Sequence, residues 1–201
     1  MINVVVLSML FGGWPQTSVA QLQKEEINVT RLSSTPRGWK QKGMWMYDQG
    51  MVMAPQKGHE ACLRRALQGD GHIIAQLHVN DELLSTTSGV CFSFSTGTIN
   101  LEQRIVDGVP FVVMELLDQG GTGLGEKVLS IPAGSVELML RRKGNHFSGW
   151  VAEPGKDFQQ VGGLDWNEVG LLIEAGIYAR VFEGGASLVR VNSLEVVGLR
   201  P

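Results

Sequence analysis

The chain has 201 residues, enough to bury one sizeable core, and its 43% apolar and 18% charged residues are typical of a globular protein. Its formal net charge is −3 and its lysines and arginines are scattered, so no basic stripe is present to bind nucleic acid. The 26 glycines fall between short apolar runs, as expected of a chain with many tight turns.

The first 20 residues have the layout of a secretory signal. An apolar run over residues 4–11 is followed by helix breakers and then by the small residues Ser18 and Ala20. The run is too short to span a bilayer. Two features argue against a signal: no Lys or Arg precedes the run, and its residues would also suit a β-strand. On the layout as a whole we expect cleavage after Ala20, one domain over residues 21–201, no membrane span, and a secreted, periplasmic or extracellular protein.

From residue 27 onward, short runs rich in Val, Ile, Leu and Phe alternate with Gly, Pro, Asp and Asn. In residues 72–79 the odd-numbered positions from Ile73 to Val79 share one apolar face, which indicates a half-buried strand. The breaks between runs contain turn residues, as in Gln68–Gly71 and Asp107-Gly108. The predicted strands are 43–47, 51–54, 62–67, 72–79, 89–95, 99–105, 110–117, 127–131, 136–142, 146–153, 159–164, 169–175, 179–183 and 189–196. With no sustained helical period, repeat or linker, this pattern predicts an all-β antiparallel fold, either a two-sheet sandwich or a barrel.

Two segments resemble domains of the concanavalin A-like lectin/glucanase superfamily. The first is Gly38-Trp39-Lys40 followed by GMWMYDQG, which resembles the opening of extracellular concanavalin-like domains, including the 3-keto-disaccharide hydrolase-like group. The second, residues 136–199, contains VELMLRRKGNHFSGWVAEPGKDFQQVG and is similar to the closing half of laminin-G-like and β-xylosidase C-terminal modules. It departs from that pattern where Glu153-Pro154-Gly155 replaces the usual Ser-Asp-Gly turn and Phe158 replaces a Trp. The resemblance implies a concanavalin-like jelly roll, with three strands of a meander over residues 136–164.

One fold hosts lectins, glycosidases and inert spacers, so function has to be argued from side chains. Polar residues alternate along the inner strands and would line one concave face if those strands were neighbours. Glu115 lies inside the apolar run 111–117, where a carboxylate needs a partner or an exposed groove. It either pairs with Arg141 or Arg104 on an adjacent strand, or it accepts hydrogen bonds from ligand hydroxyls.

A sugar ring has one apolar face, which an exposed aromatic side chain can cover. Most tryptophans of a sandwich belong to the core, and we expect this of Trp39, Trp45 and Trp166. Trp150 differs because it shares a strand face with the polar His146. The candidate ligand-binding residues are Gln76, His78, Ser93, Glu115, Arg141, His146 and Trp150, and the expected ligand is an oligo- or polysaccharide.

Catalysis finds less support in the sequence. Glycosidases use two neighbouring carboxylates, and the ExDxE strand motif that would supply them is absent; Glu115 and Asp118 fall on opposite strand faces. No GxSxG elbow occurs, and Gly120–Lys127 lacks the spacing of a phosphate loop and suits a hairpin. We therefore expect a carbohydrate-binding or surface-recognition domain without catalysis. The alternatives are a hydrolase of the 3-keto-disaccharide hydrolase-like type, using Glu115 with His78 or His146, and a structural or protein-binding domain.

Two cysteines and several isolated acids complete the inventory of reactive groups. Cys62 and Cys91 belong to no CxxC or Cys/His cluster, which argues against zinc. They are either two buried free thiols or one disulfide between neighbouring strands. No cofactor is expected, although a structural Ca²⁺ could bind one of the isolated acids, for which no loop spacing exists. Those acids are Asp48, Asp107, Asp118 and Asp165.

Overall fold

The computed structural model describes residues 23–47, 50–79, 86–106, 108–131, 134–167, 170, 172–182 and 187–199. The predicted signal segment, residues 1–20, lies outside them. Within these ranges no helix has the length and apolar character needed to cross a membrane. The strands found there are β1 (Gln23–Ile27), β2 (Lys40–Lys42), β3 (Trp45–Met46), β4 (Met51–Met53), β5 (Ala61–Val79), β6 (Thr86–Phe94), β7 (Gly97–Val106), β8 (Val109–Asp118), β9 (Gly123–Ser130), β10 (Val136–Lys143), β11 (His146–Ala152), β12 (Gln159–Asp165), β13 (Leu172–Val181) and β14 (Val189–Leu199), with a short 3₁₀ turn η1 (Val29–Arg31).

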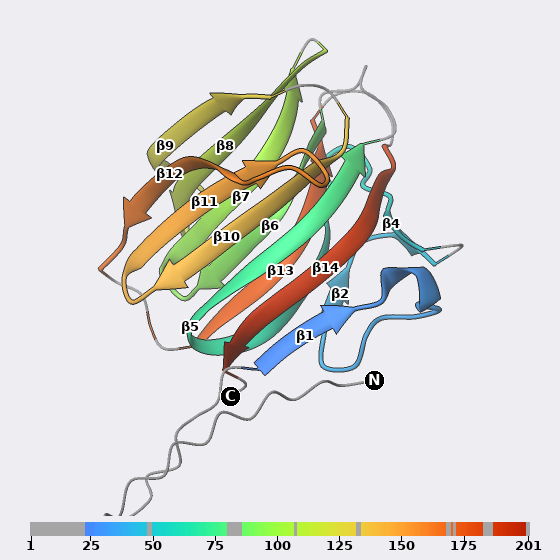
Figure 1. The fold of residues 1–201 in the computed structure, drawn as a ribbon, viewed down its shortest axis with the longest axis horizontal. Helices are drawn as coiled ribbons and strands as arrows, with labels where there is room; N and C mark the ends of the chain where they lie inside the picture. The colour runs from blue at the N-terminus through green and yellow to red at the C-terminus, as the bar shows by residue number, and fades with distance from the viewer. Residues whose placement is uncertain are drawn as a thin grey trace, which may run out of the picture.

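Strand β5 belongs to two layers. Its first half pairs with β2 and β13, and its second half pairs with β10 and β14. The first layer therefore has the order β2-β5-β13-β6-β7-β8-β9, and the second has the order β12-β11-β10-β5-β14-β1, with β4 also paired to β14. All of these strand pairs are antiparallel, and Figure 1 shows the second layer in front of the first. The prediction of an all-β antiparallel sandwich is confirmed.

Two glycines that suggested turns instead lie inside long strands. The predicted turn Gln68–Gly71 is the point at which β5 passes from one layer to the other, with Gly69 at a φ of 70°. Gly71 packs so closely on β14 that a Cβ atom there would lie 2.2 Å from the Val197 carbonyl oxygen. Likewise, the predicted strands 169–175 and 179–183 merge into β13, where a Cβ on Gly176 would lie 2.6 Å from the Leu63 carbonyl oxygen. Close approach of neighbouring strands, not chain reversal, explains both glycines.

The core lies between the two layers. Phe92, Leu101 and Met114 from the first layer are fully buried with Leu138 and Phe147 from the second. The rings of Phe92 and Phe147 contact each other across the layers in a tilted arrangement, with centroids 6.1 Å apart. The predicted meander is confirmed, because β10 pairs with β11 and β11 with β12.

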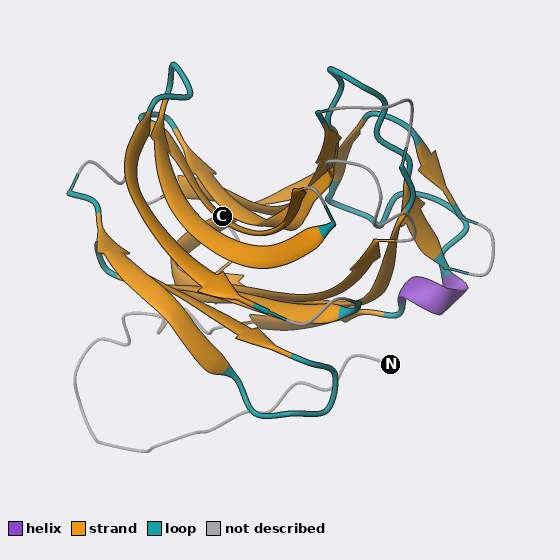
Figure 2. Cartoon of the chain, turned by 90° about the horizontal axis from the view of Figure 1, so that it is seen from above, coloured by secondary structure: helices purple, strands orange, loops and turns teal. Residues whose placement is uncertain are grey.

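The side of each layer that faces away from the core has its own shape and composition. Figure 2 shows the first layer strongly curved, with its concave side turned away from the second layer. We call the side chains on this side of β2, β5, β13, β6, β7, β8 and β9 the concave face. The side chains on the far side of β12, β11, β10, β5 and β14 form the outer face.

Candidate functional site on the concave face

The structure divides the seven predicted ligand-binding residues between the two faces. Ser93 of β6 and Glu115 of β8 lie on the concave face, in register with Glu174 and Asn100 respectively. The other five, Gln76, His78, Arg141, His146 and Trp150, lie on the outer face. The expectation that all seven line one face is wrong. The reason is topological: β5 passes from the first layer to the second at Gln68–Gly71, so its second half and β10 lie in a different layer from β6 and β8.

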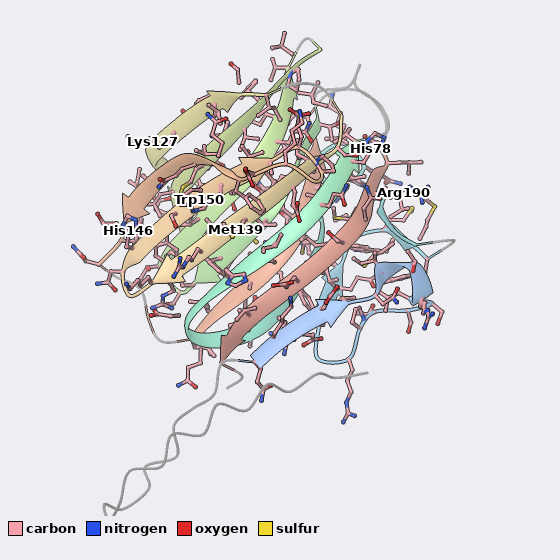
Figure 3. All side chains as sticks on the ribbon, in the orientation of Figure 1. His78, Lys127, Met139, His146, Trp150 and Arg190 are labelled. Carbon is pink, nitrogen blue, oxygen red and sulfur yellow. The ribbon has the colours of Figure 1, made fainter. Side chains whose placement is uncertain are left out.

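On the outer face the predicted residues are spread widely. His78 Nδ1 lies 3.1 Å from Ser135 Oγ, and His146 Nδ1 lies 2.8 Å from Asp165 Oδ1. Figure 3 shows these two histidines toward opposite sides of the sheet, with Trp150 and Met139 between them. Trp150 is half-buried, in register with Met139. Because neither histidine shares a layer with Glu115, the predicted pairing of Glu115 with His78 or His146 is wrong.

The remaining tryptophans follow the expected division. Trp39 and Trp166 are buried in the core, and Trp45 packs against its edge. Trp166 stacks on Phe94 with centroids 5.7 Å apart. Among the described residues, Trp150 is therefore the tryptophan that lies on a polar sheet face.

The register of the first layer places polar side chains in rows across the concave face. One row runs Lys42, Cys62, Tyr178, Gly89, Glu102, Val113 and Val128, and the next runs Lys40, Arg64, Gly176, Cys91, Asn100, Glu115 and Glu126. Side-chain hydrogen bonds gather at β7 and β8, where Arg104 binds Glu102 of the first row and Glu115 of the second.

Arg104 joins two carboxylates from neighbouring strands. Its guanidinium donates hydrogen bonds to Glu102 of its own strand and to Glu115 of β8. Asn100 Nδ2 also donates to Glu115 Oε1 at 3.2 Å, and the Tyr178 hydroxyl donates to Glu102 Oε2. The prediction that Glu115 pairs with an arginine of an adjacent strand is thus confirmed for Arg104, whereas Arg141 lies in the other layer. We call the five residues joined by these hydrogen bonds the concave network: Asn100, Glu102, Arg104, Glu115 and Tyr178.

Burial gives the concave network unusual electrostatics. Only 2% of Glu102 is exposed, and burial raises the pKa of its carboxyl above 4.5, although Arg104 opposes the shift and Glu115 adds to it. Burial and the neighbouring Glu102 raise the pKa of Tyr178 well above its ordinary value. Asn100 is 1% exposed, and its Oδ1 has no hydrogen-bond partner among the described residues. A buried acceptor without a donor costs free energy, and this oxygen is closed to solvent.

Glu102 was not among the predicted site residues, because the ExDxE motif places its carboxylates along one strand. The structure brings two carboxylates together across a strand pair, with Glu102 facing Val113 and Glu115 facing Asn100. Diagonal neighbours of this kind lie within reach of each other on one face of a sheet. The signal in the sequence was the alternation of Asn100, Glu102 and Arg104 between apolar residues of the same run.

No protein-family model and no curated protein matches the sequence. Solved structures do match. The GH43 protein BlXynB from Bacillus licheniformis matches with a TM-score of 0.70 and 11% identity, over 84% of this chain and 38% of that chain. A legume lectin-like domain from Entamoeba histolytica matches with a TM-score of 0.60 and 13% identity, over 82% of this chain and 91% of that one. The Crh5 transglycosylase matches with a TM-score of 0.67 and 10% identity, over 89% of this chain and 85% of that one.

The fold is the concanavalin-like sandwich. Three of the matching structures are GH43 proteins, and the chain spans about two fifths of the length of each. At such low identities the likeness describes the arrangement of strands, and the chemistry has to be argued from this chain's own residues.

Two thiols lie on the floor of the concave face of this sandwich. Cys62 of β5 and Cys91 of β6 are buried and free, and both pack with Tyr178 of β13. Because β13 separates their strands, they lie two strand spacings apart, about 10 Å, which exceeds the reach of a disulfide. The expectation of buried free thiols is confirmed, and the alternative of a disulfide between neighbouring strands is wrong.

The isolated aspartates have local roles where the structure describes them. Asp118 Oδ1 accepts a hydrogen bond from the Thr122 amide at 2.8 Å and so closes the β8–β9 hairpin, while Asp165 contacts His146. Asp48 and Asp107 lie outside the described residues. Among the residues described, no cluster of three or more His, Cys, Asp or Glu side chains is arranged to hold a metal. A structural Ca²⁺ stays a prediction.

Proposed function

We propose that this chain is an exported carbohydrate-binding domain that holds its ligand across the concave face. The observation that carries the proposal is the concave network, in which planar polar side chains are fixed by their own hydrogen bonds while the side chains of Arg104 and Glu115 stay 25% and 13% exposed. A pyranose hydroxyl can donate to Glu115 and accept from Arg104. Side chains that are already ordered lose little conformational entropy on binding, which favours recognition of a polar ligand.

The names of several matching structures support this proposal. They include a legume lectin-like domain and a CBM2 module of a Lactobacillus casei phage protein, alongside GH43 proteins and a transglycosylase. They do not separate binding from catalysis, so the distinction has to come from experiment.

A glycan array followed by calorimetry tests the proposal. We expect Glu115→Gln to weaken binding at least tenfold, because the neutral amide disrupts the contacts with both Arg104 and Asn100. Glu137→Gln is the matched control, since Glu137 is a half-buried strand carboxylate on the outer face. Failure of any sugar to bind at millimolar concentration would reject carbohydrate binding and favour the structural or protein-binding alternative.

One observation supports a second candidate, a glycan-active hydrolase. Burial raises the pKa of Glu102, and the neighbouring Glu115 is 13% exposed in its side chain, so two carboxyl groups in different environments lie together, as glycosidases require. Against this, Glu102 is almost fully buried, and a general acid must reach the leaving-group oxygen. We therefore rank binding first.

Incubation with mixed and C3-oxidised disaccharides decides between the two. A hydrolase predicts new products from the native protein that disappear in both Glu102→Gln and Glu115→Gln. The same product profile from all three proteins would remove the catalytic candidate while leaving binding intact.

Export is a separate part of the proposal, based on the composition of residues 1–20. Expression with the full N-terminal sequence, followed by N-terminal sequencing of protein recovered outside the cytoplasm, tests it. A mature chain that begins at Gln21 is expected. Recovery of the intact chain inside the cell alone would contradict export.

A further inference from the structure

We propose that a pocket at the β2 end of the concave face binds a sugar residue with a single carboxylate, a uronic acid. This inference rests on the proposed function and specifies the class of glycan. The pocket has a volume of about 570 Å³, and Lys42, Gly43, Pro55, His59 and Glu60 are among its lining residues.

The pocket lies where the chain after β2 meets the segment before β5. The Ala54 amide donates to the Met44 carbonyl at 3.0 Å, which joins the two walls. Gly43 has a φ of 80°, and a Cβ there would lie 2.6 Å from the Glu60 carbonyl oxygen. Only glycine allows the walls to approach this closely. The pocket is therefore shaped by the fold on both sides.

One lining residue of the pocket, Lys42, lies in the same cross-strand row as part of the concave network. Lys42 faces Cys62 on β5, in the row that continues through Tyr178 to Glu102. From β2 to β7 this row spans four strand spacings, about 19 Å. An oligosaccharide, rather than a single sugar, would bridge the pocket and the network.

Charge differs between the two ends of this row. At the pocket end, Glu60 is held by Arg64 at 3.0 Å and by Arg180 at 2.7 Å, and Glu174 is held by Lys40 at 2.8 Å. Lys42 is exposed and forms no ion pair within the described part of the chain. At the other end, three carboxylates, of Glu102, Glu115 and Glu126, share the guanidinium of Arg104. A ligand with a negative group at the pocket end and hydroxyls at the other end complements this arrangement.

The pocket also limits the charge of its ligand. Its walls include small and apolar residues such as Ala54 and Pro55, and the unpaired ammonium of Lys42 balances one negative charge. Burial would raise the pKa of Glu60, but Arg180 and Arg64 together hold it below its ordinary value, so Glu60 is ionised at neutral pH and its charge is offset by these two arginines. The carboxylate of a hexuronate can therefore lie against Lys42, the pocket cation that has no acidic partner among the described residues.

Two matched pairs of glycans on one array test the inference. Each pair consists of a neutral oligosaccharide and the uronate of the same linkage and length: cello-oligosaccharide with its C6-oxidised form, and α-1,4-galactan fragments with oligogalacturonate. We expect the uronate of at least one pair to bind roughly tenfold more tightly than its neutral partner at low salt. Added salt should reduce this preference, because the ammonium is exposed to solvent.

Variants assign the preference to the pocket. Lys42→Gln should abolish the preference by lowering affinity for the uronate far more than affinity for its neutral partner, and Lys42→Arg should retain it. Lys143→Gln, an exposed lysine on the outer face, is the control and should change neither. Equal binding of neutral and acidic partners, or a preference that survives in Lys42→Gln, would overturn the pocket assignment while the proposed function stands. Binding of no glycan at all would overturn both.

Discussion

Tyr178 and Glu102 meet above Gly89. Tyr178 of β13 faces Gly89 of β6, and Gly89 faces Glu102 of β7, so the hydrogen bond from the tyrosine hydroxyl to Glu102 Oε2 passes over the intervening strand. A Cβ atom on Gly89 would lie 2.5 Å from the Leu101 carbonyl oxygen and 2.7 Å from Glu102 Cβ. The absence of a side chain at this position lets the two buried groups reach each other.

Gly89→Ala should therefore destabilise the fold by about 1–3 kcal/mol in the free energy of unfolding, because the new methyl group has no space. Urea unfolding followed by tryptophan fluorescence measures this change. Gly123→Ala is the control, since no heavy atom lies within 4 Å of a Cβ built at Gly123. Equal unfolding midpoints for the two variants would contradict the close packing around Gly89.

The buried carboxyl of Glu102 should make stability depend on pH. Its pKa is raised in the folded state, so the folded protein binds this proton more tightly than the unfolded chain does. The resulting stabilisation is present at pH below the ordinary value of 4.5 and is lost as pH rises through the raised pKa.

Glu102→Gln keeps this side chain neutral at every pH. The free energy of unfolding of the variant should consequently gain on that of the native protein as pH rises above about 4.5. Chemical denaturation from pH 4 to pH 8 gives this difference, and Glu137→Gln serves as the control. A difference that shrinks with rising pH would show that Arg104 stabilises the charged carboxylate more than burial penalises it.

The two cysteines should remain reduced and unreactive. Burial raises the pKa of both Cys62 and Cys91 to about 11, so about one thiol in a thousand is ionised at pH 8. Iodoacetamide at pH 8 should modify neither residue in the folded protein and both in urea, as intact mass spectrometry will show. A mass lower by two hydrogens under oxidising conditions, restored by reductant, would contradict the separation of their strands by β13.

Hydrophobic periodicity was enough to predict the class of fold. Runs such as residues 72–79 alternate at most positions, and the break at Lys143–Asn145 is a true hairpin turn. Periodicity failed for β1 and β2, whose sequences QKEEI and KQK are polar and mostly exposed at sheet edges. It also failed at Gly176, because a glycine that permits close strand packing looks the same in a sequence as one that ends a strand.

The candidate site was predictable only in part, because strand order is a long-range property. Alternation correctly placed Trp150 on a polar face and Glu115 beside an arginine. It could not show that β5 passes from one layer to the other before Gln76, which places Gln76 and Ser93 in different layers. Glu102 was missed for the same reason, since its partner comes from the neighbouring strand.

The last prediction concerns the outer face, where five of the predicted ligand-binding residues lie. Trp150 lies in a cross-strand row with Met139 and Ile74, which forms a partly exposed apolar stripe between polar residues. Such a stripe suits the flat surface of a polysaccharide, whereas the concave network suits a single chain.

We expect Trp150→Ala to lower retention on insoluble polysaccharide while changing the affinity for soluble oligosaccharide by less than about twofold. Pull-down on insoluble polysaccharide and calorimetry with the best soluble ligand measure the two effects, with Glu115→Gln as the reciprocal control. Loss of soluble binding in Trp150→Ala would move the ligand to the outer face. Unchanged retention on the insoluble polymer would instead assign Trp150 a packing role beside Met139, its partner in the strand register.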